Sequence, residues 1–323
     1  MKFWRILLVS MLALGLLAHS GCGRNDKKSS TTEEKLTIQN YSYSGAAHKL
    51  VFTAKPKRVV VAGNSTLDTL IAFGEQDSIV AAVLSEKTQE EYYKKLLPKT
   101  EVRDQALSKE ALIAYKPDFI VGWRRYFSDK QMGNTSFWSD RGVPAYIQEA
   151  SGPIPSLEGF PPCTIDSEKT FINNMGKVFH KDQKAVELVK EIDDELAKVP
   201  YNTGRKPRVL VVEFLGKRIE VFGPRLLSGD IVQALGGELV AYEQPFISRE
   251  ELIFLEADVI FVVHHGQEQL RELAMKEMYN PIYSNISAVK NKRVYPLAYR
   301  QIVAPTVKLK DTISYMRSKL YGK

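Results

Sequence analysis

Hydrophobic positions along the chain fall into two long stretches in which short apolar runs alternate with amphipathic segments. Runs rich in β-branched residues and bounded by turn residues predict buried strands at 58–62, 78–83, 119–122, 143–147, 207–214, 219–222, 258–263 and 293–297. Helical spacing of apolar residues predicts helices between them, at 66–73, 109–115, 226–235, 249–255, 271–279 and 307–320. Because strand and helix alternate, the chain is expected to form an α/β fold of two Rossmann-like lobes with parallel-rich sheets.

The segment between the two stretches has a different pattern. Apolar residues recur at helical spacing from Phe171 to Leu196, and charged residues fill the gaps. This pattern predicts one long amphipathic helix over 167–199, with a break near 180–182 left open. About 30 residues would span about 45 Å at 1.5 Å per residue, enough to run along two lobes. The lobes are then expected at 36–166 and 200–323.

The N-terminus has the pattern of an export signal. Lys2 and Arg5 precede an apolar run over 6–17. That run is too short to span a bilayer, which takes about 20 apolar residues. We therefore predict a signal peptide over 1–21 that is removed on export.

Cys22 follows this segment directly, after the small residues Ser20 and Gly21. Its position is typical of a cysteine that is acylated and anchors the protein to a membrane. His19 departs from the aliphatic residue usual three places before such a cysteine, so ordinary secretion is the alternative. The polar stretch 22–35 predicts a flexible tether between anchor and fold. We expect a protein held on the outer face of the cytoplasmic membrane.

Composition and charge narrow the function classes. The 323 residues are 44% hydrophobic and 26% charged, which is typical of a globular protein with a substantial core. The formal charge is +7, or +5 without Lys2 and Arg5, and it is spread along the chain. Without a basic block among aromatic residues, nucleic-acid binding is not expected. If Cys22 is acylated, only Cys163 remains, so no intrachain disulfide is expected.

The two stretches share a local pattern. Ser108 and Ser248 each precede a short helix with a glutamate in its first turn, Glu110 and Glu250, and each helix precedes a buried strand. A glutamate there is also favourable beside the positive end of a helix, which is a purely structural explanation. Glu251 is an immediate neighbour that the pattern does not exclude.

Several such features, taken in order, resemble the solute-binding proteins of iron-siderophore, haem and vitamin B12 importers. The resemblance covers the chain from Leu36 to the C-terminus. It rests on the strand opening at 56–60, the Lys-Pro-Asp turn at 116–118, the linking helix, the glycine pair at 236–237, and the segment 292–295.

The resemblance implies a fold like that of the class III periplasmic binding proteins, with a stiff helical hinge and small lobe motion. It implies a monomer that captures a metal chelate and passes it to the permease and ATPase of an ABC importer. Glu110 and Glu250 match the glutamates with which such proteins dock onto permease arginines. No cofactor is expected, because the ligand carries the metal.

Ligand-binding residues are sought where strands end, because ligands of open α/β sheets bind beyond the carboxyl ends of the strands. After the strand 119–122 come Trp123, Arg124, Arg125 and Tyr126. The indole of Trp123 is suited to stacking on a flat ring, and the arginines to pairing with an anionic chelate. Solvated arginines on a surface loop are the alternative.

Two further strand ends carry arginine. Arg225 follows the strand 219–222, and Tyr299 and Arg300 follow the last predicted strand. Together with Arg124 these residues would bring three cations to one cleft, suited to an anionic ferric siderophore. Any one of them alone could equally be a surface residue.

His264, at the end of the strand 258–263, is a candidate ligand for haem iron, with a turn histidine as the alternative. A ferric siderophore is the favoured ligand because of the arginines. A corrinoid such as cobalamin, because of Trp123, and haem, because of His264, stay open.

Two other function classes are compatible with a two-lobed α/β chain. A two-lobed chelatase-like enzyme shares the architecture, but the chain has no GxSxG, HExxH, Walker or GxGxxG motif. A direct zinc or manganese receptor needs three or four converging His, Asp or Glu ligands, and the chain offers one histidine pair. We therefore expect a binding protein and not an enzyme.

Overall fold

The computed structural model describes residues 35–85, 89–151, 162–200, 204–240 and 244–322. The chain divides into two units, 1–33 and 34–323, and everything below concerns the second. The predicted signal peptide, Cys22 and nearly all of the tether lie outside the described residues. Within the described ranges, no helix has the length and apolar character needed to cross a membrane.

The first sheet is parallel throughout, with the strand order β5-β4-β3-β6-β7. Its strands are β3 Val59–Ala62, β4 Ile79–Val83, β5 Glu101–Arg103, β6 Phe119–Gly122 and β7 Ala145–Ile147. The connecting elements are α1 Asn64–Ala72, η1 Gln76–Ser78, α2 Glu90–Leu96, α3 Lys109–Ala114, η3 Arg124–Phe127, α4 Thr135–Ser139 and η4 Glu149–Ser151. The central strands β3 and β6 are wholly buried, as their apolar sequences predict.

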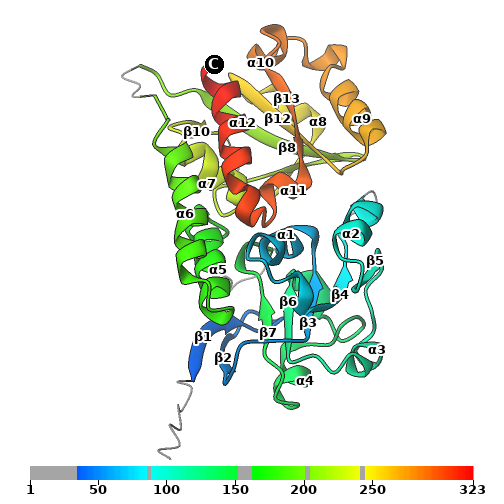
Figure 1. Ribbon diagram of the computed structural model, residues 1–323. Coiled ribbons are helices and arrows are strands. Elements are labelled where there is room, and N and C mark those ends of the chain that lie inside the picture. Colours follow the sequence, from blue (N-terminus) through cyan, green and yellow to red (C-terminus); the bar gives the residue numbers. More distant parts are fainter. Residues whose placement is uncertain (1–34, 86–88, 152–161, 201–203, 241–243, 323) are drawn as a thin grey trace, which may run out of the picture. The chain divides into compact units, whose positions relative to one another are not determined.

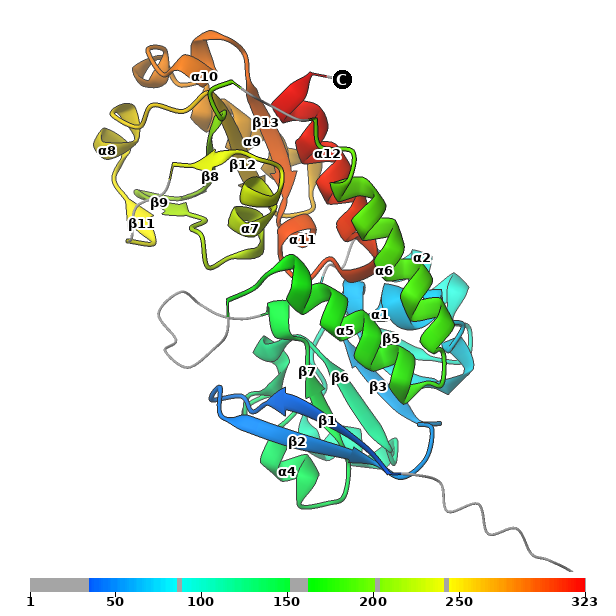
Figure 2. The same cartoon turned by 90° about the vertical axis from the view of Figure 1, so that its left-hand side faces the viewer.

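A hairpin precedes this sheet and was not predicted. β1 (Leu36–Tyr41) and β2 (Ala47–Phe52) pair antiparallel, and β1 contacts β7. Figure 2 shows the hairpin beside the first sheet.

The second sheet is mixed, with the order β11-β9-β8-β12-β13 and β10 beside β8. Its strands are β8 Arg208–Leu215, β9 Arg218–Val221, β10 Glu238–Leu239, β11 Phe246–Ile247, β12 Val259–His264 and β13 Val294–Ala298. β12 is parallel to β8 and β13, whereas β9 is antiparallel to β8. A two-residue turn joins β8 to β9, and Gly216 in that turn has a φ of +64°, so the pair forms a hairpin.

Helices cover both faces of the second sheet (Figure 1). They are α7 Leu227–Ala234, α8 Arg249–Ile253, α9 Glu268–Met278, η5 Pro281–Tyr283, α10 Ser287–Lys290, α11 Tyr299–Ile302, η6 Thr306–Lys308 and α12 Leu309–Tyr321. Along β8, Val209 and Val211 pack into the cluster that contains α7 and α12 residues, while Leu210 and Val212 pack into a second cluster that includes Met278 of α9. This alternation confirms the predicted α/β class with strands buried on both faces.

The single helix predicted over 167–199 is wrong, and the break left open near 180–182 lies where the structure separates two helices. The structure has two helices, α5 Ile165–Val178 and α6 Asp182–Leu196, and the chain reverses between them. His180 lies in this reversal with a φ of +55°, a left-handed conformation that ends helices. Each helix buries one stripe of apolar residues. The spacing of apolar residues therefore continues through the reversal, and the spacing alone does not reveal that the chain changes direction.

α5 and α6 pack side by side in antiparallel directions (Figure 2). The ammonium group of Lys169 pairs with Asp193, and a Cβ on Gly176 would lie 2.6 Å from the Cβ of Ala185. Gly176 therefore permits the close approach of the two helices. α6 also contacts α12, and α5 contacts β1 and η4, so the linking segment touches elements of both parts of the fold.

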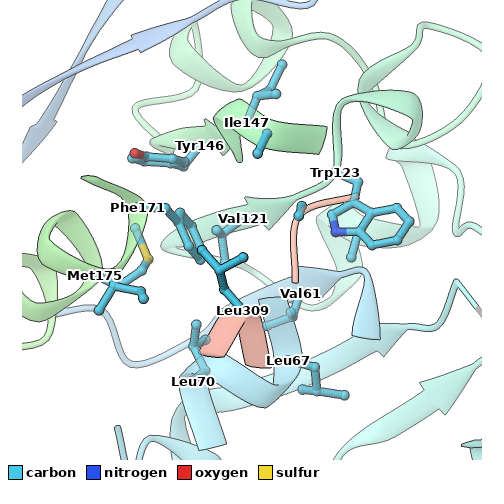
Figure 3. Close-up of a cluster of buried hydrophobic side chains, with 14 of the residues drawn as sticks. Val61, Leu67, Leu70, Val121, Trp123, Tyr146, Ile147, Phe171, Met175 and Leu309 are labelled. Carbon is cyan, nitrogen blue, oxygen red and sulfur yellow. The ribbon is translucent and has the colours of Figure 1, made fainter. Parts of the chain in front are cut away.

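The buried cores of the two sheets are continuous. One cluster of buried residues runs from β3 and β6 through α5 and α6 to α12 and β12. Figure 3 shows Leu309, at the start of α12, among Leu70, Val121 and Phe171 of the first part of the chain. Because these side chains are close-packed, the two sheets are joined by apolar contact as well as by the linking segment.

Candidate functional site

A cavity of about 220 Å³ is lined by residues that follow strands of both sheets. Trp123, Arg124 and Arg125 follow β6, Phe222 follows β9, and Tyr299 follows β13. The remaining lining residues are Ala150, Ser151, Cys163, Glu220, Leu226, Leu227, Ile302 and Val303. The cavity therefore lies where ligands of open α/β sheets bind, as the sequence predicted.

Arg124 is fixed at the cavity by backbone and aromatic contacts. Its Nε donates a hydrogen bond of 2.9 Å to the carbonyl of Tyr43, and its guanidinium lies 4.4 Å from the centre of the Tyr43 ring. Its own backbone N–H donates to the hydroxyl of Ser151 at 2.9 Å. The side chain is thus held in place before any ligand arrives.

Arg125 is exposed and rests on two aromatic rings. Its guanidinium lies 4.8 Å from the ring centre of Tyr126 and 5.5 Å from that of Trp123, and Nη2 donates to the Tyr126 hydroxyl at 2.7 Å. Tyr126 does not line the cavity: it is 4% exposed and its hydroxyl donates to the carbonyl of Leu84. Its predicted role as a ligand contact is wrong, because it lies beneath Arg125 and supports it.

Trp123 lines the cavity but is only 3% exposed. Its Nε1 donates to the hydroxyl of Ser65 at 3.1 Å, and a Cβ on Gly63 would lie 2.8 Å from the indole. Gly63 has a φ of +114°, so both the backbone and the close approach require glycine. The indole is enclosed by these neighbours, and its stacking on a flat ring of the ligand stays a prediction.

One acidic residue that was not predicted lines the opposite wall of the cavity. Glu220 of β9 lines the cavity and lies directly opposite Glu213 of β8. A carboxylate oxygen of Glu213 lies 2.9 Å from Nε2 of His265, and the His265 ring stacks on Tyr299 at 4.7 Å. The two-residue turn at 216–217 fixes this register, so the hairpin pattern could have revealed the glutamate pair.

The pKa values of this wall reflect the charges around it. Burial, followed by the charge of Glu213, raises the pKa of Glu220. Burial also raises the pKa of Tyr299, with Glu213 and Glu220 raising it further and Arg125 lowering it. The pKa of Tyr299 therefore depends on charges from both walls of the cavity.

Arg225 and Arg300 do not line the cavity. Arg225 is exposed at its edge, where its carbonyl accepts a hydrogen bond from the N–H of Cys163. Arg300 is exposed on α11 and lies towards α2, where it lowers the pKa of Tyr93 against the raising effect of burial. The predicted cluster of Arg124, Arg225 and Arg300 is thus wrong, and the cavity has Arg124 and Arg125 instead.

His264 does not face the cavity either. It lines another pocket, of about 250 Å³, with Arg249, Leu273 and Glu277, and Glu213 and His265 also line that pocket. The Nδ1 of His264 is buried without a hydrogen-bond partner in the described structure, and burial lowers its pKa. The predicted placement of His264 at the ligand is therefore wrong. Within the described ranges, no group of three or more His, Cys, Asp or Glu side chains could hold a metal ion.

Glu110 and Glu250 occupy equivalent positions. Each is the second residue of its helix, α3 or α8, and each is exposed. Backbone and Ser108 hydrogen bonds lower the pKa of Glu110, so it stays charged. Glu251 is engaged differently: its carboxylate accepts the N–H of Ser248 at 2.7 Å as part of a capping box. The capping box uses the carboxylate of Glu251 and does not use that of Glu250.

Comparison with known proteins places the chain among binding proteins. The family model described as periplasmic binding protein matches residues 59–299. The Fe(3+)-citrate-binding protein YfmC of Bacillus subtilis (strain 168) is 24% identical over 98% of each chain. The petrobactin-binding protein YclQ of the same organism is 23% identical over 91% of this chain and 90% of its own. The crystal structure of a periplasmic binding protein from Veillonella parvula DSM 2008 covers 90% of this chain and 92% of its own, with 27% identity and a TM-score of 0.79.

Proposed function

The chain belongs to the periplasmic binding protein family, and from this premise we propose that it captures a ferric siderophore and delivers it to an ABC importer. It is a solute-binding protein and not an enzyme, and it works outside the cytoplasm. The two relatives from Bacillus subtilis are named as binding proteins for Fe(3+)-citrate and for petrobactin, which supports the ligand class.

The observation that carries the proposal is the pair of arginines at the cavity. Arg124 and Arg125 are already held on Tyr43, Tyr126 and Trp123, so binding need not order them. Charge-assisted hydrogen bonds contribute about 1.5–3 kcal/mol each. Two such contacts would supply a large part of the about 8–12 kcal/mol that micromolar to nanomolar affinity requires. The enclosed indole of Trp123 and the position of His264 outside the cavity favour a siderophore over cobalamin or haem.

Replacing Arg125 by alanine is expected to weaken binding of an anionic chelate such as ferric citrate by about 1–3 kcal/mol, or about 5- to 150-fold in Kd. Arg141→Ala is the matched control, because Arg141 also lies over an aromatic ring, that of Phe137, but outside the cavity. Isothermal titration calorimetry would measure both. Equal Kd values for Arg125→Ala and the wild type would remove Arg125 from the site.

The anchor proposed at Cys22 can be tested separately. Cys22→Ser should move the protein from the membrane fraction to the soluble fraction and abolish labelling by a fatty-acid analogue, because no other residue is proposed to carry the lipid. A Cys22→Ser protein that stays in the membrane fraction would contradict lipid anchoring without affecting the ligand proposal.

A further inference from the structure

The two walls of the cavity carry opposite charges. Arg124 and Arg125 line one wall, after β6, and Glu220 lines the other, on β9. The two kinds of charge are close enough to act on one side chain. Besides burial, both glutamates of the β8–β9 hairpin raise the pKa of Tyr299, and Arg125 lowers it. A ligand with anionic groups alone would satisfy only the arginine wall.

The acidic wall is built into the hairpin. Glu213 and Glu220 are directly opposite in an antiparallel pair, an arrangement that is unfavourable for two like charges. Glu213 is 7% exposed and is paired with His265. Glu220 is half-buried, lines the cavity and has Glu213 beside it. A cation at Glu220 would offset both its burial and the repulsion from Glu213.

From this geometry we infer that the cavity selects a ferric chelate that carries an amine, with Glu220 as the residue that receives the ammonium group. The inference rests on the proposed function and narrows its ligand class. The metal-binding oxygens of the chelate would face Arg124 and Arg125, and the ammonium group, a compact donor of three hydrogen bonds, would face Glu220. A wholly anionic chelate would offer Glu220 no cation and would be bound less tightly.

The test uses two ferric trihydroxamates that differ only in one charge: ferrioxamine B, which has a free ammonium group, and its N-acetylated form. Ferric citrate is the wholly anionic probe. The wild type is expected to bind ferrioxamine B about tenfold or more tightly than the acetylated form, as expected for a charge-assisted contact. Glu220→Gln keeps the side-chain shape but not the charge, and should close this gap by weakening ferrioxamine B alone.

Glu272→Gln is the control for net charge, because Glu272 is exposed on α9 and does not line the cavity. It should preserve the wild-type gap. Equal wild-type affinities for the two ferrioxamines, a gap that Glu220→Gln leaves unchanged, or binding of ferric citrate alone would each overturn the inference. If the wild type binds none of the three chelates, the proposed function itself fails.

Discussion

Raising the pH from 5 to 9 is expected to lower the free energy of unfolding of the wild type by about 6 kcal/mol, and Glu168→Gln is expected to remove about 4 kcal/mol of this loss. Glu168 is 0% exposed, in the first part of α5, and its Oε2 accepts the N–H of Thr306 at 2.6 Å. Burial raises its pKa to about 8, against which the Thr306 bond acts, and the charge of Glu149 raises it further.

The sign follows from proton binding. The folded protein holds the Glu168 proton more tightly than the unfolded chain, whose carboxyl has a pKa near 4.5. The resulting stability is fully present below about pH 4.5 and is lost as the pH rises through about 8. Glu149 adds to the same trend, because burial raises its pKa to about 7 although Tyr146 donates a hydrogen bond to it.

Urea denaturation at a series of pH values would measure this effect. Glu256→Gln is the control, since Glu256 is an exposed residue paired with Arg208, and it should reproduce the wild-type pH dependence. Parallel stability curves for the wild type and Glu168→Gln would contradict the account of Glu168. The effect bears on function because the hydroxyl of Thr306 also accepts a hydrogen bond from Thr69 of α1. Through its own bond to Thr306, Glu168 therefore helps to hold the segment around Thr306 against α1.

Replacing both Glu110 and Glu250 by alanine is expected to leave chelate affinity unchanged and to reduce import by about tenfold or more. The two exposed carboxylates occupy equivalent positions on α3 and α8 and do not line the cavity. Each lost contact with a permease arginine would cost about 1.5–3 kcal/mol of docking free energy. Uptake of radioactive iron by cells, together with calorimetry on the purified variant, would separate import from binding.

Glu251→Ala provides the matched control for this double variant. It removes the capping box of α8, so a small loss of stability is expected, but it should leave uptake near the wild-type rate. Normal uptake by the Glu110→Ala, Glu250→Ala protein would reject the docking role. If Glu251→Ala also lost uptake, the cause would be damage to helix α8 and not the loss of the two docking glutamates.

Much of the fold could be predicted because buried strands have a clear composition. The runs that became β3, β6, β8 and β12 are β-branched and bounded by turn residues, so their type and position were correct. The hairpin of β1 and β2 was missed because these strands mix exposed polar and buried apolar residues without a strong apolar run. The reversal between α5 and α6 was missed because a helix pattern carries no information about direction.

The candidate site was harder to predict because successive residues of a strand point to opposite faces of the sheet. A shift of one position at a strand end therefore reverses the direction of the side chain. His264 continues the face of Ile260 and Val262 on β12, away from the cavity, whereas His265 continues the other face and reaches Glu213. Arg225 and Arg300 follow strands as predicted, but the loops and helices after those strands direct them elsewhere. Arg124 and Arg125 were found because several candidate residues followed one strand.

A fluorescence titration would measure directly whether the cavity between the strand ends binds a ferric chelate. The mature protein would be titrated with ferric citrate and ferric siderophores while its tryptophan emission is followed, since Trp123 lies under Arg125 at the cavity. We predict saturable binding of one chelate per chain with a Kd of about 1 μM or lower, and its loss when Arg124 and Arg125 are both alanine. Saturable binding that survives this double replacement, or no saturable response to any ferric chelate, would contradict the account.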